Sequence, residues 1–195
     1  MEIGAVLSQN RQKRSVTRAV PLLVASTLLL AAAAGTHAAE TARTPLVLTA
    51  YSNGPGGEQL LAGDYAQAFA EMSKARPQDT LAASTKATNL CVAYAVTRKL
   101  TEAKDACEVA LRLAKAERLS SSRYSPGTMR ENADLAAAYT NRAVVRMLMR
   151  DAASAKADLQ RAQSLAPQAE FVMKNVAAVA KAGTAIAQAD VTPSR

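Results

Sequence analysis

The chain has 195 residues, which is enough for one domain with a hydrophobic core. Aromatic residues make up only 4% of the sequence and tryptophan is absent, which argues against a β-sandwich, since sandwiches need aromatic and β-branched residues. The net charge is +8, but the charges are interspersed and lack the clustered basic residues and aromatics of nucleic-acid-binding proteins. We therefore expect an α-helical protein with no nucleic-acid partner.

The first 38 residues are typical of an export signal. Residues 11–18 are basic, Ala19–Gly35 is apolar, and small residues lead up to Ala38. An uncleaved anchor helix is the alternative, but an apolar run of about 17 residues is at the lower limit for crossing a bilayer. We expect cleavage after Ala38, a periplasmic or secreted protein, and no membrane span after cleavage.

The mature chain is poor in catalytic residues. His37 is the only histidine, so cleavage after Ala38 would remove it. No aspartate and glutamate pair recurs at metal-ligand spacing, and the serines at 120–122 have no base to activate them. We predict no enzyme activity, no metal and no cofactor.

Residues 39–57 show no helical periodicity, and we expect a flexible segment. Within it, Pro45–Tyr51 could be a short extended piece, but the sequence shows no strand to pair with it. Ser52–Gly57 is a glycine-rich turn cluster. A phosphate-binding loop would be followed by Lys-Ser or Lys-Thr, but Glu58-Gln59-Leu60 follows this run. We therefore do not expect the run to bind phosphate.

Residues 58–188 carry apolar residues at helical spacing and form the predicted domain, followed by a disordered tail over 189–195. The serines at 120–122 and the Ser125-Pro126-Gly127 run predict a long loop over Ser120–Asn132. Its role as a functional loop or a tolerated insertion stays open. The predicted helices are Glu58–Ala62, a helix capped by Asp64 and ended by Pro77, Leu81–Val96, Thr101–Glu117, Ala133–Met149, Ala152–Ala166 and Gln168–Gln188.

The two cysteines face each other across a predicted helical hairpin. Cys91 and Cys107 each lie eight residues from Lys99, near the centre of the turn. They are either buried free thiols or a disulfide, which the oxidising compartment favours. A bridge would close a loop of about 15 residues and contribute about 3 kcal/mol in the chain-entropy model.

Self-comparison of the chain reveals a repeat. Asn141 and Asn175 are 34 residues apart, and Asn89 and Asn141 are 52 apart, which is 34 plus an insertion of 18. Ala103 and Ala155 are also 52 apart. A 34-residue helix-turn-helix with small residues at helix crossings resembles the tetratricopeptide repeat, and the resemblance covers residues 58–188. It implies an all-α solenoid with about two full repeats, a truncated first unit and a C-terminal capping helix.

The resemblance also implies where a partner would bind. Tetratricopeptide modules bind peptides or helices on the concave face, which the first helix of each repeat lines. The candidate partner-binding residues on that face are Thr88, Asn89, Val92, Val96, Thr140, Asn141, Val144, Met147 and Leu148. The alternatives are that the terminal helix covers the apolar members and that the asparagines bond the backbone of a neighbouring helix. Arg142 and Arg146 could meet an acidic partner or pack against the neighbouring repeat.

These observations predict a periplasmic, non-enzymatic adaptor or assembly factor that binds a protein partner. The alternative is a small-ligand or cell-wall-fragment binding protein, in which the loop over Ser120–Asn132 closes over the bound molecule. Self-association stays open as well.

Overall fold

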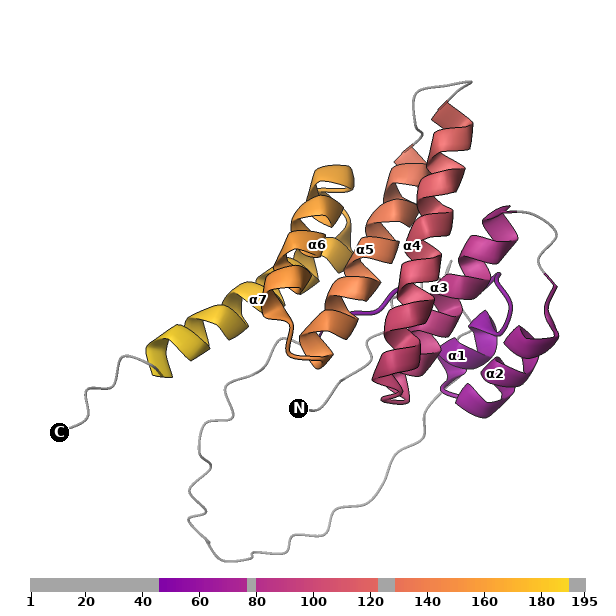
Figure 1. The fold of residues 1–195 in the computed structure, drawn as a ribbon, viewed down its shortest axis with the longest axis horizontal. Helices are drawn as coiled ribbons and strands as arrows, with labels where there is room; N and C mark the ends of the chain where they lie inside the picture. The colour runs from indigo at the N-terminus through magenta and orange to yellow at the C-terminus, as the bar shows by residue number, and fades with distance from the viewer. Residues whose placement is uncertain (1–45, 77–79, 123–128, 190–195) are drawn as a thin grey trace, which may run out of the picture. The chain divides into compact units, whose positions relative to one another are not determined.

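Seven helices make up the part of the chain that the computed structural model describes, which is residues 46–76, 80–122 and 129–189 (Figure 1). No strand occurs among these residues, and the prediction of an all-helical protein is confirmed. The predicted signal peptide, the Ser125-Pro126-Gly127 run and the predicted tail beyond residue 189 lie outside the described residues. The helices are α1 (Gly57–Ala62), α2 (Tyr65–Lys74), α3 (Thr80–Val96), α4 (Leu100–Ser122), α5 (Met129–Leu148), α6 (Ala152–Leu165) and α7 (Glu170–Ala189).

Three helical hairpins are closed by the same turn. Its central residue has a left-handed backbone, with φ of 82° at Gly63 between α1 and α2, 62° at Arg98 between α3 and α4, and 66° at Arg150 between α5 and α6. Each turn is a Schellman motif, in which two backbone N–H groups satisfy carbonyls at the end of the first helix. The bonds, each from an N–H to a carbonyl, are as follows in the three turns: Gly63 to Leu60 and Asp64 to Gln59 in the first, Arg98 to Ala95 and Lys99 to Tyr94 in the second, and Arg150 to Met147 and Asp151 to Arg146 in the third.

Two of the three hairpins start their second helix with an aspartate cap. Asp64 accepts a hydrogen bond of 3.0 Å from the Gln67 N–H, and Asp151 accepts one of 3.1 Å from the Ser154 N–H. Hydrogen bonds from the Ser154 side chain and then its backbone lower the pKa of Asp151. In the middle hairpin, α4 begins at Leu100, one residue before the predicted start at Thr101.

The helices form two sides of the described region. On one side, α1 contacts α3, α3 contacts α5, and α5 contacts α7, so the first helix of each hairpin neighbours the next (Figure 1). On the other side, α4 packs between α3 and α5, and α6 packs between α5 and α7. Alanines at the crossings, including Ala103, Ala143 and Ala155, are buried and allow the backbones to approach closely.

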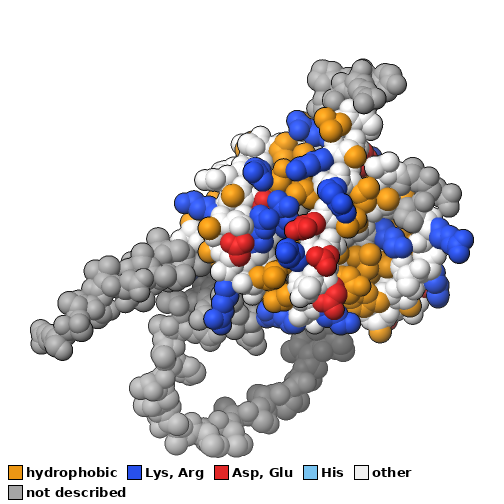
Figure 2. Space-filling model, viewed as in Figure 1, with side chains coloured by type: hydrophobic (Ala, Val, Ile, Leu, Met, Phe, Trp, Pro, Cys, Tyr) orange, Lys and Arg blue, Asp and Glu red, His pale blue; other side chains and the backbone are white. Residues whose placement is uncertain are grey.

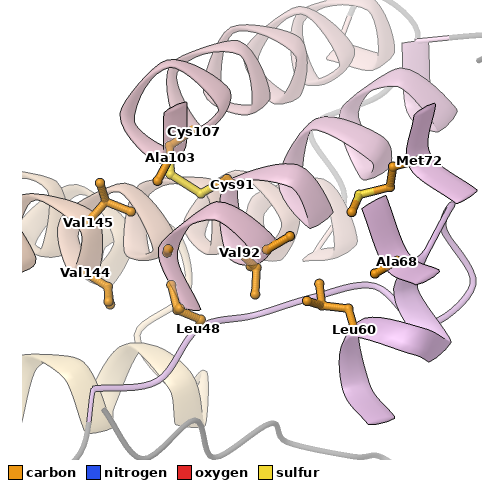
Figure 3. Packing of buried hydrophobic residues seen from close by; sticks show 12 residues of the cluster. Leu48, Leu60, Ala68, Met72, Cys91, Val92, Ala103, Cys107, Val144 and Val145 are labelled. Carbon is orange, nitrogen blue, oxygen red and sulfur yellow. A yellow bond between two sulfur atoms is a disulfide. The ribbon is translucent and has the colours of Figure 1, made fainter. Parts of the chain in front are cut away.

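The cysteine pair lies in the core between α3 and α4 (Figure 3). Cys91 and Cys107 are fully buried and form a disulfide, with their α-carbons 4.8 Å apart. This separation is within the range that a disulfide spans without backbone movement. The facing positions eight residues from the turn therefore do bring the two thiols together.

The connection between α4 and α5 differs from the predicted loop over Ser120–Asn132. Helix α4 continues through Ser122, and α5 already begins at Met129. The expectation that three serines end the helix was wrong, because a serine hydroxyl can bond within the last helical turn. Ser120 Oγ donates such a bond of 2.7 Å to the Glu117 carbonyl.

Candidate functional site

A non-helical segment of the chain, Leu46–Tyr51, lies across α7, α5 and α3; we call it the N-terminal segment. It is held by three asparagines, one from each of these helices: Asn175, Asn141 and Asn89. We call these three residues the asparagine row. The row is fully buried or nearly so, with side chains from 0% to 1% exposed.

Each asparagine binds one residue of the segment through that residue's own backbone. Asn175 pairs with Val47, Asn141 with Thr49 and Asn89 with Tyr51, always through a backbone N–H donating to Oδ1 and Nδ2 donating to the backbone carbonyl. The distances are 2.8 and 2.8 Å at Val47, 2.8 and 2.8 Å at Thr49, and 2.8 and 3.0 Å at Tyr51.

The pattern has a simple geometric basis. Alternate residues of an extended chain present their N–H and C=O groups on the same side. An asparagine amide offers one acceptor and two donors, so it can satisfy both groups of one residue, much as a neighbouring strand would. Because the row itself bonds only main-chain groups, proline, which lacks the N–H, is the one residue whose backbone it cannot pair with in this way.

Side chains set the register of the segment on the row. Leu48, which is 3% exposed, enters the main core cluster, where Figure 3 shows it between Val92 of α3 and Val144 of α5. Leu46 and Ala50 also pack against this cluster. The side chains of alternate residues therefore meet apolar surface, while the backbones of the residues between them meet the asparagines.

Tyr51 adds a polar anchor at the end of the segment. Its hydroxyl donates a hydrogen bond of 2.7 Å to Asp134 Oδ1 on α5. Burial raises the pKa of the Tyr51 phenol well above its ordinary value, and the charge and hydrogen bond of Asp134 raise it further. The phenol therefore stays protonated and remains a donor.

A tight turn returns the chain from the segment to α1. The Gly54 N–H bonds the Tyr51 carbonyl at 3.1 Å, and Asn89 Nδ2 donates a further bond of 3.1 Å to the Pro55 carbonyl. A side chain at Gly57 would overlap the Tyr51 carbonyl, and one at Gly54 would overlap the Thr85 side chain. The glycines let this turn pack directly against the segment and α3.

The structure brings together most of the residues predicted to bind a partner. Asn89 and Asn141 are in the row, Val92 and Val144 are in the core cluster beneath Leu48, and Val96 and Leu148 pack against the same cluster. The remaining three lie differently. Thr88 and Thr140 are buried and bond carbonyls of their own helices, Ser84 and Ala136, and Met147 packs on a separate cluster beside α6.

Sequence reasoning left two parts of this site out. Asn175 is the third member of the row, and its spacing of 34 residues from Asn141 was the signal that could have included it. The N-terminal segment has no such signal, because the row binds its backbone. The asparagines bond this segment, and the alternative that they bond a neighbouring helix does not describe these contacts.

Arg142 and Arg146 bind within the molecule. Both donate to the fully buried Asp158 of α6, Arg142 through two hydrogen bonds of 2.8 and 2.7 Å and Arg146 through one of 2.7 Å. The Asp158 hydrogen bond raises the pKa of Arg142 further above its ordinary value. Figure 2 shows basic and acidic side chains intermingled on this face of the molecule. Asp158 belongs to the second helix of the same α5–α6 hairpin, so these bonds are made neither to an acidic partner nor to the neighbouring repeat.

No family model, curated protein or solved structure matches the chain. In the described ranges, no helix is both long enough and apolar enough to cross a bilayer. The same residues contain no group of three or more side chains placed to bind a metal ion.

Proposed function

We propose that this chain is an exported, non-enzymatic interaction module, an adaptor or assembly factor that binds a protein partner on the side formed by α3, α5 and α7. The observation that carries the proposal is the asparagine row with a peptide segment on it. Three side chains, one each from α3, α5 and α7, are spaced to satisfy the backbone groups of alternate residues of an extended chain. A surface of this kind is suited to peptide recognition, because main-chain bonds provide affinity and apolar pockets provide selectivity.

The proposal also assigns the helices to a short tetratricopeptide-like array. The three equivalent turns support it, since Arg98 and Arg150 are 52 residues apart, the same offset as Asn89 and Asn141. In such an array each hairpin buries its apolar face against its neighbours, and the first helices form one continuous binding side. The predicted signal peptide would deliver this array to the periplasm or the exterior.

Site-specific photo-crosslinking in a periplasmic extract tests the binding side. A crosslinking residue at Thr85, which lies beside the turn of the segment, should capture a reproducible protein partner. The matched control is Val109 on α4, a 37% exposed position on a helix that does not contribute to the row. Equal capture from both positions, or none from Thr85, would contradict the proposed binding side.

A further inference from the structure

The asparagine row is already occupied, and its occupant belongs to the same chain. Six hydrogen bonds join the backbone of the segment residues to the three asparagines, and the contact between Val47 and Asn175 joins residues 128 positions apart. A partner that binds the same groups has to take the place of the N-terminal segment.

We propose that the N-terminal segment is an exchangeable internal ligand of the asparagine row, and that a partner replaces it with an extended segment of its own. This inference rests on the proposed function and names the kind of partner. The replacing segment needs free backbone N–H and C=O groups at three alternate positions and an apolar side chain at the position of Leu48.

The geometry favours a cis occupant over one donated by a second copy. The turn over Ser52–Gly57 is short and is held by the Gly54 and Asn89 hydrogen bonds, so the segment reaches the row of its own chain directly. A short tether gives a high effective concentration, which a competing peptide must overcome. The apparent association constant for a partner is therefore the intrinsic constant multiplied by the fraction of molecules in which the segment is off the row.

A labelled nonapeptide with the sequence of residues 44–52, TPLVLTAYS, is the probe. Leu48→Asp in the full chain should release the internal segment, because the charge would have to enter the core beside Val92. We expect the peptide to bind this variant at least about tenfold more tightly than the unaltered protein, since the open fraction rises. Equal affinities for the two proteins would overturn the proposal.

Methylation of single peptide nitrogens identifies the binding mode. A methyl group on the Thr49 nitrogen removes the donor to Asn141 and should weaken binding by about tenfold or more. A methyl group on the Leu48 nitrogen is the matched control, because that nitrogen belongs to a residue the row does not pair with. Equal losses for the two peptides would show that the row does not read the backbone.

A second form of the protein covers the case in which Leu48→Asp does not fold. A specific protease site inserted between the exposed residues Ser52 and Asn53 allows the folded chain to be cut, leaving the segment bound without a covalent link. Exchange of the cut segment for the labelled peptide supports the proposal. A segment that never exchanges is a permanent structural strap, and segments that exchange between intact copies indicate a swapped dimer; either result overturns it.

These outcomes are separate from a failure of the proposed function. A peptide that exchanges while Thr85 captures no partner would overturn the function and keep the exchangeable segment. A partner that Thr85 captures equally well with and without excess peptide would keep the function and overturn the exchange.

Discussion

At the scale of single residues, the asparagines of the row combine roles that are usually separate. They are buried like core residues, yet they bond the polar backbone groups of a segment that belongs to no helix or strand. An apolar residue at the same place would fill the volume but would leave two backbone groups without partners. This is why side chains of this polarity are found in the middle of three packed helices.

Replacing Asn141 with leucine should destabilise the protein. The change leaves the Thr49 N–H and carbonyl without partners, which should lower the free energy of unfolding by about 2–4 kcal/mol. Urea denaturation measures the loss. The exposed Asn53, changed to leucine in the same way, should alter stability by less than about 0.5 kcal/mol. Losses of equal size for the two variants would contradict the role of the row.

Tyr51 should make stability sensitive to alkaline pH. Because folding raises its pKa, its stabilising contribution is complete below the ordinary tyrosine value of 10.0 and is lost as the pH rises above that value. We expect Tyr51→Phe to lower stability near neutral pH, through the lost bond to Asp134, and to make stability fall less steeply above pH 10.0. Denaturation curves from about pH 8 to about pH 11 compare the two slopes. Parallel slopes would show that the phenol is not buried as described.

At the scale of helices, the α3–α4 and α5–α6 hairpins differ in the contacts that join their two helices. The α3–α4 hairpin combines a Schellman turn, close packing through alanine and a disulfide. The α5–α6 hairpin has the equivalent turn and, in place of a disulfide, the buried ion pairs of Asp158 with Arg142 and Arg146. Two different chemistries therefore hold the two complete hairpins together.

Reduction of the Cys91–Cys107 disulfide should lower the free energy of unfolding by about 3 kcal/mol, because the unfolded chain regains the entropy of a loop of about 15 residues. Thermal unfolding with and without reductant measures the shift. The double variant with alanine at both positions is the control, and its melting temperature should not respond to reductant. Alkylation of two thiols in the folded, unreduced protein would show that the bridge does not form.

At the scale of the whole molecule, the position of the N-terminal segment would link the predicted export to folding. The predicted cleavage after Ala38 leaves Ala39 as the first residue, only seven positions before Leu46. The cysteine pair also needs an oxidising compartment to form its bridge. Both features favour a protein that completes its folding after export.

The exported protein should begin at Ala39. Intact-mass measurement of protein recovered from the periplasm or the medium should match the chain without residues 1–38. A variant with an aspartate in place of Leu29, at the centre of the apolar run, should remain inside the cell at full length. Recovery of the full-length chain from the membrane fraction would instead indicate an uncleaved anchor.

The sequence by itself determined the helical hairpins, their common offset and the facing cysteines. These features depend on contacts between residues close in the chain, so apolar spacing, turn residues and small residues at Ala103 and Ala155 leave a readable periodic pattern. The end of α4 was predicted too early, because serine is common in loops but can also bond a carbonyl within the last turn of a helix. Ser120 does so with the Glu117 carbonyl.

Only the tertiary structure decided where the N-terminal segment lies. The row binds its backbone, which is chemically the same in every residue except proline, so the side chains of Val47 and Thr49 do not identify the bonds to the asparagines. The bond between Val47 and Asn175 also spans 128 positions, far beyond any local periodicity. The asparagine spacing was visible in the sequence, but its function as a holder of an extended chain depends on packing α3, α5 and α7 side by side.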